Sequence, residues 1–163
     1  MHINCAKRTA METQVNEKAT LEVYQQLLLQ WNKRNAAGMA GLFAVDGTLI
    51  GFDGSQLNGQ KEIFEVLNEI FTHHPTASYI SIVKEVRQLT PGSVMLLAVV
   101  GMVAEGHTDI SPAVNALQTL VVTTENEEPR VALFQNTPAA FHGRPELSEQ
   151  LSADLRAALN SGN

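Results

Sequence analysis

The chain of 163 residues has the length of one domain, and its 44% hydrophobic content is enough to form a core. The 17 acidic residues outnumber the 11 basic ones and give a formal net charge of −6, which repels phosphate backbones and argues against a nucleic-acid partner. The single cysteine, Cys5, excludes an internal disulfide and fits a reducing compartment. The longest apolar run, residues 94–104, is about half a membrane span. We therefore expect a cytoplasmic protein that does not contact a membrane.

The first 18 residues are polar and show no signal peptide, so we expect a flexible tail over residues 1–18 and a single domain over residues 19–160. Apolar residues recur at helical spacing after Thr20, which is a plausible helix cap. The elements predicted before Pro75 are helices over 19–34, 36–44 and 60–73, with a brief strand over 48–52.

Four strand-like segments and a closing helix follow Pro75. The segments span residues 78–90, 93–103, 113–124 and 130–137, and the helix spans 145–159. In the first segment we expect Ile80, Ile82 and Val86 to share one face, with Glu85 and Arg87 on the other. Helices first and consecutive strands later predict an α+β fold with an antiparallel sheet.

The strand predicted over residues 93–103 is apolar on both of its faces. An antiparallel strand of this kind needs a cover on each side of the sheet. The early helices can supply one cover. A bend of the sheet, the C-terminal helix or a second subunit must supply the other, and we expect a homodimer joined across the outer sheet face.

Local motifs point to a known family. They are Trp31-Asn32, the stretch 36–44, Asp46-Gly47-Thr48, the glycine-led entry 59–63 to the third helix, and the stretch 130–138. With the order of elements, they resemble the nuclear transport factor 2-like superfamily, its SnoaL-like branch and, within that, the SgcJ/EcaC-like group. The resemblance covers residues 19–141. It implies a cone-shaped, strongly curved, antiparallel-rich sheet wrapped around the N-terminal helices, as in cystatin-like α+β barrels.

The resemblance also implies a pocket, but fold analogy does not choose its chemistry. The family uses one cone for ketosteroid isomerisation, polyketide cyclisation, epoxide hydrolysis, dehydration and plain binding. We therefore expect binding of a small hydrophobic molecule, with cofactor-free acid–base catalysis as one option and a non-catalytic binding or dimerisation module as the alternative. Members of the group are often labelled oxidoreductases. The sequence has no Gly-x-Gly-x-x-Gly or Walker-type loop, so we expect no cofactor.

Amide side chains in the last two predicted strands are the first candidates for ligand binding. If the acidic turn at residues 125–128 joins a hairpin, Gln118 lies opposite either Gln135 or Asn136, depending on a one-residue difference in register. Such amides could orient a ligand carbonyl or hydroxyl. Alternatively, they bond only to one another and to nearby backbone, as amides inside sheets commonly do.

Further candidates are two aromatic and two acidic residues. Trp31 and Tyr79 could form pocket walls, although aromatics at helical spacing are often core residues. Asp46 begins the Asp-Gly-Thr turn and Asp53 forms a turn with Gly54, so each could simply bond its own turn backbone. If either projected into an apolar cavity, burial would raise its pKa and make it a general base.

Two polar residues on the loop after the second long strand raise metal binding as an option. His107 and Asp109 lie two positions apart, which is half of a metal site at most, with no third ligand fixed by the sequence. We therefore expect no metal site.

Overall fold

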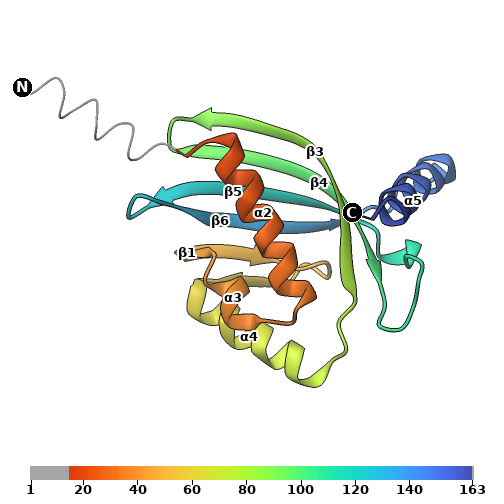
Figure 1. Ribbon diagram of the computed structural model, residues 1–163, viewed down its shortest axis with the longest axis horizontal. Helices are drawn as coiled ribbons and strands as arrows, with labels where there is room; N and C mark the ends of the chain where they lie inside the picture. The colour runs from red at the N-terminus through yellow and green to blue at the C-terminus, as the bar shows by residue number, and fades with distance from the viewer. Residues whose placement is uncertain (1–14, 163) are drawn as a thin grey trace, which may run out of the picture.

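One six-stranded sheet organises residues 15–162, the part of the chain that the computed structural model describes (Figure 1). The elements in chain order are α2 (Glu17–Asn32), α3 (Ala36–Ala40), β1 (Phe43–Ile50), β2 (Gln56–Asn58), α4 (Gln60–His73), β3 (Ser78–Thr90), β4 (Ser93–Val103), the 3-10 turn η1 (Pro112–Val114), β5 (Ala116–Glu125), β6 (Glu128–Pro138) and α5 (Pro145–Asn160). The strand order is β2-β1-β6-β5-β4-β3, with β1 parallel to β6 and the other neighbours antiparallel. The expected α+β class is confirmed.

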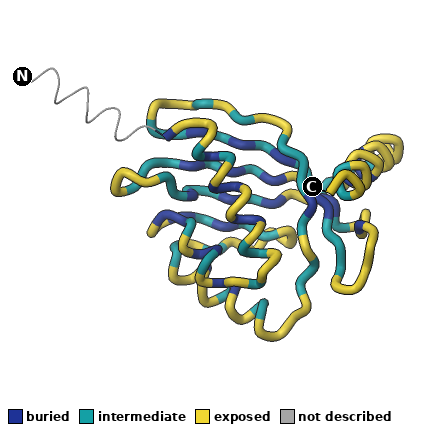
Figure 2. The backbone as a smooth tube through the Cα atoms, in the orientation of Figure 1, coloured by how far each residue is buried: buried dark blue, intermediate teal, exposed yellow. Residues whose placement is uncertain are grey.

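Helices cover both faces of this sheet. The main core lies between the sheet and α2, α3 and α4, and we call the sheet face that borders it the inner face. The opposite, outer face carries α5, packed over β3 and β4 with a smaller core of its own. Figure 2 shows buried positions alternating with less buried ones along the central strands, as expected for a sheet whose two faces differ in cover.

Helix α2 begins earlier than its apolar pattern predicts. Asn16 is the N-cap, and its side chain accepts a 2.7 Å hydrogen bond from the Ala19 amide, so Thr20 lies inside the helix instead of capping it. Val15 is only 3% exposed and its amide donates to the Pro91 carbonyl. Residues 15–18 thus belong to the folded domain, which corrects the expected tail over residues 1–18. The rest of that tail, residues 1–14, lies outside the described residues.

The second predicted helix is too long. Helix α3 ends at Ala40, and β1 already begins at Phe43, so the prediction of a helix over 36–44 and a strand over 48–52 is wrong at this boundary. Strand β1 is fixed by pairing with β6, and the Val131 amide donates a 2.9 Å hydrogen bond to the Leu42 carbonyl just before it. Tertiary pairing here outweighs local helical periodicity.

A bulge in β3 changes the face on which its later residues lie. The register of β3 against β4 shifts between Val83 and Glu85, which places Val86 on the inner face with Val83. Ile80 and Ile82 pack on the outer face under α5. The prediction that Val86 shares a face with these two isoleucines is therefore wrong, because strict alternation does not continue through an extra residue.

The doubly apolar strand is β4. Its inner-face residues Val94, Leu96 and Ala98 are buried in the main core. On the outer face, α5 covers the end of β4 near Val99, while Met95 and Leu97 are partly exposed. The early helices thus cover the inner face, and α5, one of the three covers considered for the outer face, covers part of it. The homodimer stays a prediction.

Within residues 15–162, no helix combines the length and apolar character needed to cross a membrane.

Candidate functional site

A cavity of about 370 Å³ lies between the inner face of the sheet and the helices. Its walls come from α2, α3, α4, the five strands β1, β2, β3, β4 and β6, and the turn that joins β1 to β2, and most of the side chains are apolar or aromatic. They are Trp31, Met39, Leu49, Gly51, Phe52, Asp53, Ser55, Leu57, Val66, Leu67, Ile70, Tyr79, Met102, Phe134 and Asn136. A smaller hollow of about 130 Å³ shares Phe52, Tyr79, Met102 and Asn136 with it, so the two spaces adjoin.

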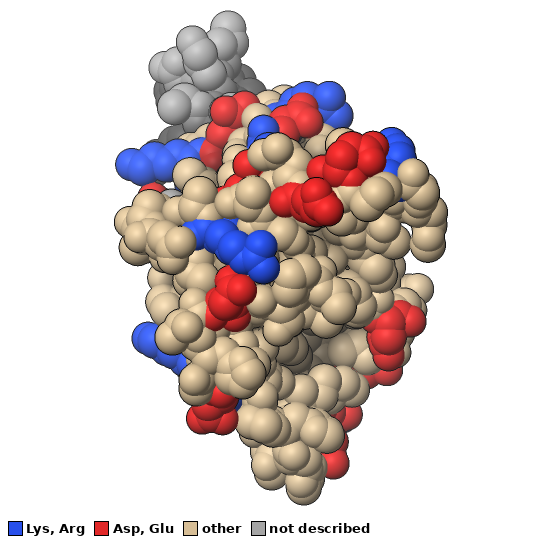
Figure 3. Space-filling view, turned by 90° about the vertical axis from the view of Figure 1, so that its right-hand side faces the viewer, with Lys and Arg blue, Asp and Glu red and all other residues tan. Residues whose placement is uncertain are grey.

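The molecule is visibly hollowed at one end. Figure 3 shows the end of the molecule at which β3 begins and β4 ends in Figure 1, with a depression whose immediate surroundings are largely uncharged. The Asp and Glu side chains on this face lie mostly away from the depression. A largely uncharged, concave surface is typical of sites that bind apolar small molecules.

Two predicted amides and one tyrosine form a buried hydrogen-bond chain beside the cavity. The Tyr24 hydroxyl of α2 donates to Gln118 Oε1 on β5 at 2.6 Å. Gln118 Nε2 donates to Asn136 Oδ1 on β6 at 2.9 Å, and Asn136 Nδ2 donates to the Ile50 carbonyl of β1 at 3.3 Å. Tyr24 and Gln118 are each 1% exposed. The amides therefore do bond to one another and to backbone, the alternative that the sequence left open, while Asn136 also lines the cavity.

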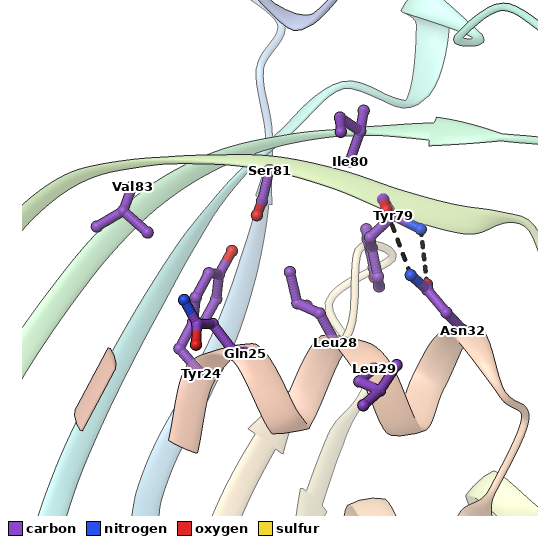
Figure 4. Close-up of a pocket in the computed structure, with 9 residues that line it drawn as sticks. All are labelled: Tyr24, Gln25, Leu28, Leu29, Asn32, Tyr79, Ile80, Ser81 and Val83. Atoms are coloured by element: carbon purple, nitrogen blue, oxygen red, sulfur yellow. Dashed lines mark hydrogen bonds between the residues drawn. The ribbon is translucent and has the colours of Figure 1, made fainter. Parts of the chain in front are cut away.

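Tyr79 is held in place at the cavity wall by the last turn of α2. The Asn32 side chain brackets the Tyr79 main chain, accepting from its amide at 2.8 Å and donating to its carbonyl at 3.4 Å (Figure 4). The Trp31 ring packs against the Tyr79 ring with centroids 5.4 Å apart, and Trp31 Nε1 donates to the Ala77 carbonyl at 2.9 Å. Both aromatic residues proposed as pocket walls thus line the cavity.

Burial controls the ionisation of both tyrosines. Loss of solvent raises the pKa of Tyr79 to about 12, an effect that a hydrogen bond with Gln118 partly offsets. Burial likewise raises the pKa of Tyr24, partly offset by a hydrogen bond with Ser81, towards which its hydroxyl points in Figure 4. Both phenols are consequently neutral over the whole physiological range and available as hydrogen-bond donors.

A spectroscopic titration checks these two pKa shifts. Because the chain contains only 2 tyrosines, the absorbance of phenolate near 295 nm measures the ionisation of Tyr24 and Tyr79 and of no other residue. We expect no ionisation near pH 10 in the folded protein, and ionisation near pH 10 once the protein is unfolded in urea. Since folding raises these pKa values, stability should be full below pH 10 and should fall as the pH rises towards about 12. A folded-state phenol that ionises at pH 10 would contradict the burial.

The hairpin register separates the remaining amides. Gln118 pairs with Asn136, and Gln135 pairs with Thr119. Because adjacent residues of a strand point to opposite faces, Gln135 lies on the outer face, away from the cavity. This placement corrects the expectation that Gln135 could serve the pocket, whereas Gln118 supports the cavity wall from behind. Ligand binding by Trp31, Tyr79, Gln118 or Asn136 stays a prediction.

Neither candidate acid has the environment of a general base. Asp46 is exposed in β1 and is not part of the cavity wall. Asp53 borders the cavity but is exposed, and its carboxylate accepts from the Ser55 amide and the Ser55 hydroxyl, each at 2.9 Å. These bonds lower the pKa of Asp53, the reverse of the rise that burial would cause. In the structure, Asp53 therefore bonds to its own turn, which is the alternative that we weighed from the sequence.

Sequence reasoning missed the role of Tyr24. The residue stands in the apolar stripe of the first helix, and only its hydroxyl, which requires a partner when buried, could have drawn attention to it. Phe52, Met102 and Phe134 were also missed as cavity residues. No local signal identifies them, because the cavity brings together segments that are far apart in the chain.

Comparisons with solved structures identify the fold. A cystatin-like domain of unknown function from Nostoc punctiforme superposes with a TM-score of 0.72 at 22% identity, covering 90% of this chain and 98% of that one. A nuclear transport factor 2-like protein of unknown function from Shewanella oneidensis gives 0.58 at 14% identity, covering 74% and 97%. A putative scytalone dehydratase from Novosphingobium aromaticivorans gives 0.62 at 12% identity, covering 75% and 83%.

The fold is therefore nuclear transport factor 2-like, or cystatin-like, as the resemblance predicted. No family model matches the sequence, and no curated protein matches it either. At these identities the likeness concerns the fold alone, and the SnoaL-like and SgcJ/EcaC-like assignments stay predictions.

Proposed function

We propose that the protein binds a small, largely apolar molecule in the cavity between the sheet and the helices. The observation that carries this proposal is the cavity itself, about 370 Å³ in volume with predominantly apolar and aromatic walls. This volume lies within the range of small-molecule sites, and few polar groups among many apolar ones is their usual composition. The neighbour named as a scytalone dehydratase, a small-molecule enzyme by its name, has the same fold, which is compatible with this proposal.

The described residues favour binding over acid–base catalysis. Among the side chains that line the cavity, the carboxylate of Asp53 is the one acidic group, and hydrogen bonds to Ser55 lower its pKa. A general base works best with a pKa near the operating pH, and the environment of Asp53 shifts it the other way. Tyr79 and Asn136 are suited to orient a bound molecule.

Filling the cavity should weaken binding strongly. We expect Val66→Trp, on the cavity side of α4, to weaken binding of neutral bicyclic aromatics by at least about tenfold, since the added ring occupies the space that the ligand needs. Ligand-observed NMR with 2-acetylnaphthalene and related naphthalenes measures the effect. The matched control is Leu89→Trp, which places the same ring at an exposed position of β3 outside the cavity wall. Absence of binding by any naphthalene, or equal binding by both variants, would contradict the proposal.

A further inference from the structure

The cavity meets solvent at the turn that joins β1 to β2. Most of the residues that line it are buried or half-buried, and the three exposed ones are Phe52, Asp53 and Ser55. All three lie between the end of β1 at Ile50 and the start of β2 at Gln56. Phe52, Asp53 and Ser55 therefore form the mouth of the cavity.

Hydrogen bonds within this turn hold the Asp53 carboxylate at the cavity wall. The Gly51 amide donates to the Ser55 carbonyl and the Gly54 amide donates to the Gly51 carbonyl, each at 2.9 Å. The Ser55 amide donates to Asp53 Oδ1, and the Ser55 hydroxyl donates to Asp53 Oδ2. A Cβ atom added at Gly51 would lie 3.4 Å from Asp53 Oδ1. Because Gly51 and Ser55 both line the cavity, the carboxylate between them lies at its wall.

This carboxylate is ionised and has no cationic partner. The hydrogen bonds from the Ser55 amide and hydroxyl lower the pKa of Asp53, which is therefore negative at neutral pH. Among residues 15–162, Asp53 takes part in no ion pair. No Lys, Arg or His stands among the described residues that line the cavity or the smaller adjoining hollow. Each carboxylate oxygen can accept a second hydrogen bond, so both keep capacity for a donor.

An aromatic side chain lies beside Asp53 in the chain. Phe52 is 40% exposed and lines both adjoining spaces. The face of an aromatic ring attracts a cation, and so does a carboxylate. At an exposed mouth a cation also keeps part of its hydration, so it avoids the large cost of burying a charge. The mouth is therefore suited to a cationic group, whereas the interior is suited to an apolar one.

We propose that the molecule bound in the cavity carries an ammonium group on an apolar body. The ammonium pairs with the Asp53 carboxylate at the mouth, beside Phe52, and the apolar body fills the interior. An aryl carboxylate is disfavoured, because its charge would meet Asp53 and a chain of net charge −6 with no basic residue in the described wall to offset them. The proposal rests on the proposed function, because it specifies the chemistry of a molecule bound in the same cavity.

Three naphthalenes that differ in one group test this preference for a cation. They are 2-(2-naphthyl)ethylamine, which is cationic at neutral pH, the neutral 2-(2-naphthyl)ethanol and the anionic 2-naphthylacetate. By ligand-observed NMR at low salt, we expect the amine to bind about fivefold more tightly than the alcohol, the upper end of what an exposed ion pair gives. The acetate should bind least tightly. Raising the salt concentration to about 0.5 M should bring the amine-to-alcohol ratio towards one, because salt screens exposed charges.

Two variants assign the preference to the mouth. Asp53→Ser removes the charge but keeps a hydroxyl that can accept from the Ser55 amide, so the turn can still form. The amine-to-alcohol ratio should fall to about one, because the ion pair is lost, and alcohol binding should change little. Phe52→Leu keeps an apolar mouth without the ring and should lower the same ratio about twofold.

The matched control for Asp53→Ser is Asp154→Ser. It removes the same charge from an exposed position of α5, the helix on the outer face of the sheet, and should leave the amine-to-alcohol ratio unchanged. If Asp53→Ser does not fold, the salt series and the acetate comparison test the preference in the wild-type protein.

The outcomes separate this inference from the proposed function. Failure of all three probes to bind counts against the proposed function. Equal binding of the amine and the alcohol, or tighter binding of the acetate, leaves binding in the cavity intact and overturns the preference for a cation. An Asp53→Ser protein that weakens all three probes equally would mean that the turn only shapes the wall. An equal loss of preference in Asp154→Ser would assign it to net charge, and either result overturns the role of Asp53.

Discussion

Replacing Gln118 by leucine is expected to lower the free energy of unfolding by about 3 kcal/mol. Gln118 is 1% exposed and bonds Tyr24 at 2.6 Å and Asn136 at 2.9 Å. Leucine leaves the Tyr24 hydroxyl and the Asn136 oxygen without this partner, and a buried polar group that loses its partner costs about 1–3 kcal/mol. The larger apolar surface of leucine offsets only part of that loss. Urea unfolding followed by circular dichroism measures the difference.

The hairpin provides a matched control for this substitution. Gln135 is also a strand glutamine, but it lies on the outer face opposite Thr119 and is only partly buried. We expect Gln135→Leu to change the free energy of unfolding by less than about 0.5 kcal/mol, as is usual for substitutions away from buried networks. Equal or greater stability of the Gln118→Leu protein would mean that Gln118 is an ordinary core position and that the chain from Tyr24 to Ile50 contributes nothing.

The fold could be predicted from the sequence where periodicity is strong and uninterrupted. The apolar stripe of α4 gives its bounds, residues 60–73, because a single helix face meets the core throughout. The Pro91-Gly92 turn likewise made the end of β3 and the start of β4 predictable, because this residue pair is typical of a tight turn. In contrast, the start of β1 at Phe43 depends on pairing with β6, almost ninety residues later in the chain, and no local pattern contains that information.

The candidate site was predictable in its residue types more than in its geometry. Trp31, Tyr79 and Asn136 follow from polar and aromatic residues in apolar surroundings, and all three line the cavity. The choice between Gln135 and Asn136 needed a register that a hairpin sequence leaves ambiguous by one residue. The sequence could not show which way the Asp53 carboxylate points, and in the structure it bonds to Ser55 within its own turn.

Replacing Gly47 by alanine is expected to lower the free energy of unfolding by about 3 kcal/mol, at the upper end of the usual cost of overpacking. A Cβ atom at this position would lie 2.6 Å from the Val131 carbonyl oxygen and 3.1 Å from that of Ala44. Both are backbone atoms that cannot turn away as a side-chain end can. Gly47 lies where the parallel pairing of β1 with β6 shifts register, between Phe43 and Thr48, so the strands must separate to admit a methyl group.

This position connects the Asp-Gly-Thr motif of the sequence with the cavity. The Gly47 carbonyl accepts a 2.8 Å hydrogen bond from the Gly59 amide at the start of α4, and β1 continues into Leu49 and the turn that walls the cavity. The matched control is Gly92→Ala, where the nearest atom to an added Cβ is the Thr90 hydroxyl oxygen at 4.0 Å, an ordinary contact. Thermal unfolding of the two variants measures the contrast. A Gly47→Ala protein as stable as Gly92→Ala would show that β1 and β6 tolerate separation, and that close backbone packing does not explain the glycine.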